Sequence, residues 1–107
     1  MLLSQDALIP ERKLTKYLLV PLEQDDKSKF LAQAGYTLEN WQELKEDLRT
    51  QVLTQPAEYA ETTDWGDKYS IRCCLVGRNG VELKIRTIWL VTDRTTDFVT
   101  LIPDKGA

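Results

Sequence analysis

Two alternating stretches on either side of Gly77-Arg78-Asn79-Gly80 constrain the fold more than any other part of the sequence. Apolar and polar residues alternate before and after this tetrapeptide, which predicts two half-buried strands joined by a tight turn. A two-residue turn would pair odd with even positions and put one apolar row on the wrong face. A three-residue loop, Arg78-Asn79-Gly80, pairs odd with odd, so we expect this loop, with Gly80 in the left-handed conformation. The apolar rows both fall on odd positions: Tyr69, Ile71, Cys73 and Leu75, then Val81, Leu83, Ile85 and Trp89.

This register places two arginines opposite each other on the outer face of the predicted sheet. Arg72 faces Arg86, and Lys84 lies beside them, across from Cys74. Like charges directly opposite each other destabilise a sheet. Compensation could come from Glu82, from an acidic side chain elsewhere in the chain, or from an anionic ligand.

The far half of the second strand is apolar on both faces, because Ile88 and Leu90 follow Lys84 and Arg86 on the outer side. Such a strand is either covered by a terminal segment, such as LLSQDALI at residues 2–9, or contacts another protein. The outer face is therefore a candidate surface for a protein partner or a homodimer.

The first part of the chain predicts helices. Leu14, Tyr17 and Leu18 share one face of a helix that follows Pro10 and stops before Pro21. The i, i+3, i+4 spacing of these three residues predicts that they face the core.

Two further helices follow. Asp25 and Asp26 precede a short helix that Gly35 ends, and Asn40 with Glu43 has the spacing of a capping box for the next one. Pro56 lies beyond the end of this third helix. Its apolar stripe consists of Trp41, Leu44, Leu48 and Val52.

The remaining strand candidates are YAETT at 59–63 and FVTLI at 98–102. The sequence thus predicts an α+β fold, with about three N-terminal helices packed on one face of an antiparallel meander of three to four strands. A chain of 107 residues is expected to be a single domain over 1–107. Residues 1–9 are expected to be a flexible or edge-covering segment.

Composition excludes several kinds of chemistry. The chain has no histidine, which removes the commonest general base and the Ser-His and Cys-His nucleophile pairs. Cys73 and Cys74 are neighbours in a strand and point to opposite faces, so we expect two reduced thiols and no zinc site. No cofactor and no metal are predicted.

Charge and hydropathy limit the partners. The net charge is −3 and the pI about 4.9, which disfavours broad binding to nucleic acid. No apolar run reaches the roughly 20 residues that span a bilayer, and the N-terminus does not have the pattern of a secretory signal. We expect no membrane association and a cytoplasmic location.

Several stretches, taken in order, resemble a family of uncharacterised bacterial domains of unknown function. The likeness covers about residues 13–103 and includes RTIWLV and a Val-Thr-x-x-Pro ending at Pro103. The other matching stretches are KLTKYLL, KSKFLAQAGY, LENWQELKEDLR and GDKY. Members of this family occur alone and as tail domains of phage-related proteins. The order of helices and meander also looks like that of the barnase, colicin and RelE group of ribonuclease toxins.

Two functions are therefore predicted. The leading hypothesis is a non-enzymatic protein-interaction module, of a toxin–antitoxin-like or mobile-element kind. Its contact surface would consist of Arg72, Lys84, Arg86, Ile88 and Leu90, with Trp65 at the edge as an exposed anchor.

The alternative, implied by the toxin-like resemblance, is a small metal-independent ribonuclease or RNA-binding protein. Cations would stabilise the charge on a scissile phosphate, and hydroxyls would position the RNA. The residues with these roles would be Lys27, Lys29, Arg86, Thr87 and Thr100.

Overall fold

The computed structural model describes residues 1–24 and 26–104, and all of its helical segments precede its strands. The helical segments are α1 (Glu11–Lys13), η1 (Leu14–Leu18), α2 (Ser28–Ala32), η2 (Leu38–Asn40), α3 (Trp41–Asp47) and η3 (Leu48–Val52). The strands are β1 (Glu58–Thr63), β2 (Gly66–Val76), β3 (Glu82–Val91) and β4 (Thr96–Pro103). They form one antiparallel sheet in the order β1-β2-β3-β4, which confirms the α+β class and the meander.

The β2–β3 hairpin has the predicted three-residue loop. Gly77 donates its backbone N–H to the carbonyl of Val81 at 2.8 Å, which closes a loop of Arg78, Asn79 and Gly80. Gly80 has φ 86°, in the left-handed region that glycine adopts without steric cost. The pairing is that expected from the parity of the apolar rows: Tyr69 with Trp89, Ile71 with Thr87, Cys73 with Ile85, and Arg72 with Arg86.

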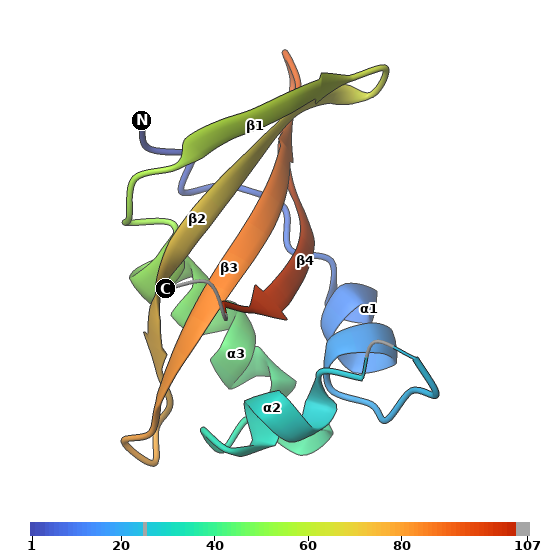
Figure 1. Cartoon of the computed structure of the whole chain (residues 1–107), viewed down its shortest axis with the longest axis vertical. Helices are drawn as coiled ribbons and strands as arrows, with labels where there is room; N and C mark the ends of the chain where they lie inside the picture. The colour runs from blue at the N-terminus through green and yellow to red at the C-terminus, as the bar shows by residue number, and fades with distance from the viewer. Residues whose placement is uncertain (25, 105–107) are drawn as a thin grey trace.

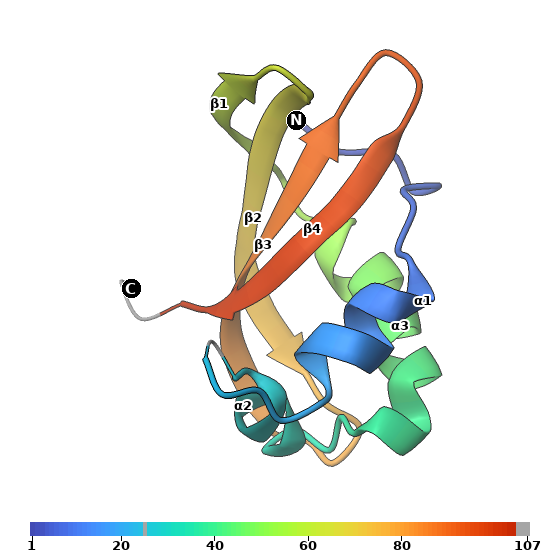
Figure 2. The ribbon, with the colours of Figure 1, turned by 90° about the vertical axis from the view of Figure 1, so that its right-hand side faces the viewer.

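One hydrophobic core lies between the sheet and the helices. Figure 2 shows α1 and α3 on the same side of the sheet. Trp89, at the centre of this core, is fully buried and packs edge-to-face on Phe98 of β4, with ring centroids 5.2 Å apart. The helices contribute Leu14, Leu18, Leu31, Leu44, Leu48 and Val52, and the strands Ile71, Leu75, Leu83, Ile85 and Leu101.

The first helix buries a different set of residues from the predicted one. Leu14 and Leu18 are buried, but Tyr17 is 57% exposed. The cause is a wide turn: Leu19 donates to the carbonyl of Leu14 at 3.0 Å, an i→i+5 bond, and Leu19 is buried in turn. This wider turn brings Leu18 and Leu19 to the core and leaves Tyr17 on the surface.

The helix ends differ in part from the predicted caps. Gly35 has φ 85°, as expected for a helix C-terminus, and Asp26 accepts a hydrogen bond from the Ser28 N–H at 2.9 Å. Asp25 lies outside the described residues. The predicted capping box of Asn40 with Glu43 is wrong, because the helix begins one turn earlier and Asn40 Oδ1 accepts from the Thr37 N–H at 2.7 Å.

The N-terminal segment packs on the core side of the sheet. Leu8 accepts a hydrogen bond from Phe98 and donates one to Thr96, beside the start of β4. Leu3, Ala7 and Ile9 are buried in the core cluster. In Figure 1 this blue segment passes behind β2 and β3, on the same side as α3. It therefore covers the inner face and leaves the outer face without this cover.

Candidate functional site

The outer face of the sheet carries the residues that the alternation of β2 and β3 directs away from the core. Arg72 and Lys84 are exposed, and Arg86, Ile88 and Leu90 are half-buried. We call these five residues the outer surface. Ile102 of β4 pairs with Arg86 and extends the same row to the edge of the sheet.

Arg72 is compensated by a carboxylate from the end of β4. Its guanidinium donates two hydrogen bonds to Asp104, from Nε to Oδ2 at 2.9 Å and from an Nη to Oδ1 at 3.1 Å. Since β3 lies between β2 and β4, the Arg72 side chain extends across β3 to reach this partner. The hydrogen bonds and the charge of Asp104 raise the pKa of Arg72. Of the three kinds of compensation that the sequence left open, the structure uses an acidic side chain from elsewhere.

Arg86 has no such partner among the described residues. Its Nε is buried and makes no hydrogen bond within them, and none of their carboxylates lies within ion-pair distance of its guanidinium. A buried N–H donor without an acceptor costs about 1–3 kcal/mol. The described chain therefore contains, at the centre of the outer surface, a cation with one buried N–H donor that has no acceptor.

Trp65 lies in the two-residue turn between β1 and β2 and is 80% exposed. The next residue, Gly66, packs so closely on the end of β3 that a Cβ there would lie 2.7 Å from the carbonyl oxygen of Val91. Trp65 is therefore at the end of the sheet where Leu90 and Val91 lie.

The residues suggested for a ribonuclease are only partly brought together. Thr87 is fully buried, accepts a hydrogen bond from the Trp89 indole at 2.7 Å and donates one to the Ile71 carbonyl at 3.4 Å. Its hydroxyl thus stabilises the core and does not face solvent. Lys29 is exposed on α2, and Arg86 lies on the outer face.

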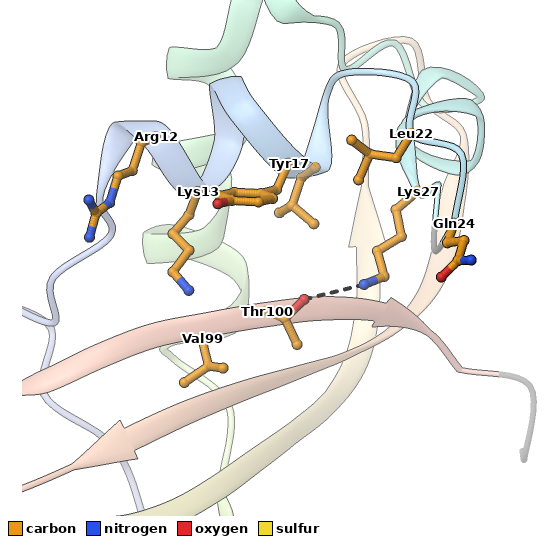
Figure 3. A pocket seen from close by; sticks show the side chains of 9 residues that line it. Arg12, Lys13, Tyr17, Leu22, Gln24, Lys27, Val99 and Thr100 are labelled. Carbon is orange, nitrogen blue, oxygen red and sulfur yellow. Dashed lines mark hydrogen bonds between the residues drawn. The ribbon is translucent and has the colours of Figure 1, made fainter. Parts of the chain in front are cut away.

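Lys27 and Thr100 do meet. Lys27 Nζ donates to Thr100 Oγ1 at 3.4 Å, across the edge of β4 (Figure 3). The two residues line a groove of about 530 Å³ between the first helix and β4. Sequence reasoning did not find this groove, because it placed Tyr17 in the core and gave no role to Arg12 and Lys13.

The two thiols are free and are poor nucleophiles. Burial raises the pKa of Cys73 to about 11, and a hydrogen bond with Glu82, followed by burial, raises the pKa of Cys74. Both are therefore protonated at neutral pH. Within residues 1–24 and 26–104, no group of three or more Cys, Asp and Glu side chains is placed to hold a metal ion.

Comparison with protein families gives one assignment. The model of the family described as "Domain of unknown function (DUF6883)" matches residues 4–105, nearly the whole chain. The chain belongs to this family. Searches of curated proteins and of solved structures found no match. None of the helices in the described part of this family member is long and apolar enough to cross a membrane.

Proposed function

We propose that this member of the family is a non-enzymatic interaction module whose outer surface binds an acidic region of a protein partner. The observation that carries the proposal is Arg86, a cation with a buried, unpartnered Nε. A carboxylate of a partner would accept from this guanidinium and remove the cost of the unsatisfied donor.

The apolar part of the outer surface supports the same proposal. A sheet strand that is apolar on both faces needs a cover, and the N-terminal segment is committed to the inner face through Leu3, Ala7 and Ile9. Ile88, Leu90 and Ile102 remain half-buried on the outer face. A contact that combines an apolar centre with a few charged anchors is typical of protein interfaces.

The charges favour a different protein over a second copy of the chain. In a two-fold symmetric dimer the same patch faces itself. This would bring together Lys84 and Arg86 of both copies, which form no ion pair with any residue in the described part of the chain. An acidic partner meets no such repulsion. A toxin–antitoxin-like or mobile-element pair is the biological setting that we propose for it.

The test is a charge reversal on the outer surface. The partner is first identified as a protein that co-purifies with the tagged chain from its own cells, and it is then purified. Its binding is measured by titration against Arg86→Glu. The matched control is Lys16→Glu, on the exposed side of the first helix. We expect Arg86→Glu to weaken binding at least 100-fold, because a like charge replaces the attraction, and Lys16→Glu to change it less than about threefold.

A stability measurement separates this result from misfolding. Arg86→Met removes the unsatisfied donor and the repulsion with Arg72 but keeps an apolar stem, so its unfolding free energy should equal or exceed that of the wild type. The proposal fails if Arg86→Glu binds the partner normally, or if Arg86→Met is destabilised by more than about 1 kcal/mol.

The contact between Lys27 and Thr100 favours a second candidate, a small metal-independent ribonuclease or RNA-binding protein. Such a protein would cleave or bind RNA in the presence of a chelator, and Lys27→Ala would abolish this activity without loss of the fold. RNA that remains intact and unbound at micromolar protein would exclude this candidate.

A further inference from the structure

The groove at the edge of β4 is an unusual concentration of positive charge in an acidic protein. Three of its lining residues, Arg12, Lys13 and Lys27, are cations, and none of the described lining residues is an aspartate or a glutamate. The chain as a whole has 17 acidic and 14 basic residues. The local charge is therefore opposite in sign to the net charge.

None of these cations forms an ion pair with a described residue. Four other basic side chains do form ion pairs or charged hydrogen bonds with the chain: Lys68 with Glu61, Arg72 with Asp104, Arg78 with three carboxylates, and Arg49 with backbone carbonyls. Cations that converge without carboxylates repel one another, and an anion placed among them would remove this repulsion.

The hydrogen bond of Lys27 leaves a donor for such an anion. Because Thr100 Oγ1 accepts from Lys27, its own hydroxyl proton is free to point elsewhere and to donate. In Figure 3 the side chains of Lys13 and Lys27 both extend toward β4, where Thr100 lies. The Lys27 ammonium and the Thr100 hydroxyl thus lie together, and the Lys13 ammonium lies farther along β4 in the same groove.

The rest of the groove suits an apolar or aromatic body. Its volume of about 530 Å³ lies in the range of small-molecule sites, about 300–1,000 Å³. Leu18 and Leu22 line the wall, and Tyr17, which is 57% exposed, presents its ring beside them. An exposed aromatic ring offers a stacking surface to a planar ligand.

We propose that this groove binds a phosphomonoester whose organic part is aromatic, either a free small molecule or the phosphorylated end of an RNA. A phosphomonoester carries about −1.5 to −2 charges at neutral pH and three acceptor oxygens, which matches several cations better than a single carboxylate does. The phosphate contacts Lys13, Lys27 and Thr100, and the aromatic part lies against Tyr17. This site shares no residue with the outer surface, so it does not depend on the protein-partner proposal.

The test is calorimetric titration of the full chain with phenyl phosphate. Lys27→Gln should weaken binding at least tenfold, whereas Lys29→Gln, which removes an exposed lysine two residues away and outside the groove, should leave it unchanged within about twofold. Lys27→Arg should restore most of the affinity. Tyr17→Ala should weaken phenyl phosphate at least fivefold but leave inorganic phosphate unaffected, because only the first has a ring to stack.

Two further probes separate the sources of the phosphate. If a 5′-mononucleotide or an aryl phosphate binds more tightly than a short RNA, the ligand is a free metabolite. If a 5′-phosphorylated oligonucleotide binds more tightly than its 5′-hydroxyl form, the ligand is an RNA end. The proposal is overturned if phenyl phosphate does not saturate the wild type in the millimolar range, or if Lys29→Gln reduces binding as much as Lys27→Gln. Arg86→Glu should leave this binding intact, so failure of the partner proposal remains distinguishable.

Discussion

Tyr36 and Asp47 meet in the interior, where the phenol donates to the carboxylate at 2.6 Å. Both residues are buried, and Asp47 also accepts from Arg78 in the β2–β3 loop at 3.4 Å. Tyr36 donates to the carbonyl of Val76 as well, at 3.3 Å. These bonds join the third helix to the end of the hairpin through one buried carboxylate.

Replacing the phenol tests this connection through its pH dependence. Burial, and then the hydrogen bond with Asp47, raise the pKa of Tyr36 above its ordinary value of 10.0. A phenol with a raised pKa in the folded state contributes stability fully below pH 10 and loses it as the pH rises further. Tyr36→Phe should cost about 1.5–3 kcal/mol at neutral pH, and the difference from the wild type should shrink as the pH is raised from about 9 toward 12.

Urea unfolding at a series of pH values measures this difference, and Tyr17→Phe is the matched control because Tyr17 is exposed. A difference for Tyr36→Phe that stays constant over this pH range, or a Tyr17→Phe profile that follows it, would contradict the assignment.

At the scale of elements, the hairpin depends on a glycine that sequence patterns did not single out. Gly77, at the end of β2, is buried, and a Cβ there would lie 2.0 Å from the carbonyl oxygen of Ala34, just past α2. Gly77→Ala should therefore force the hairpin away from α2 and lower the unfolding free energy by at least about 2 kcal/mol.

Gly80→Ala is the comparison variant. A Cβ on Gly80 meets nothing within 4 Å, so the only cost is its left-handed φ of +86°, about 1 kcal/mol. The denaturation midpoints of Gly77→Ala and Gly80→Ala measure the two stability losses. Equal midpoints would show that the structure accommodates a Cβ next to Ala34 at little cost.

The same hairpin shows what the sequence could and could not predict. Its register followed from the parity of two apolar rows, because a slip by one residue would reverse every side chain. A hydrophobic period of 3.6 residues does not predict the wide helical turn that exposes Tyr17. The helix start at Leu38 was not predicted, because Asn40 fits the N-cap pattern equally well. The groove was missed because Lys27 and Thr100 are 73 residues apart and the DRTTD turn left the register of β4 open.

At the scale of the whole molecule, the N-terminal segment connects the sheet to the helices. Ile9 is buried in the core, whereas its neighbour Leu8 is 51% exposed and holds β4 through backbone hydrogen bonds, which a substitution preserves. Ile9→Ala should lower the unfolding free energy by about 2–5 kcal/mol and Leu8→Ala by less than about 0.5 kcal/mol. Thermal unfolding followed by tryptophan fluorescence measures both, and similar losses would show that the segment contributes little to the core.

The β1 edge has a consequence for how any partner is chosen. This strand contains Glu58 and Glu61 and has an irregular register between Tyr59 and Glu61, features that discourage the addition of another strand. Backbone pairing is indifferent to the identity of the incoming side chains, so an edge open to it would accept many chains. With that route discouraged at β1, a partner bound as proposed would be selected by a few side chains of the broad face, and changes at those positions would redirect the domain to a new target without rebuilding its scaffold.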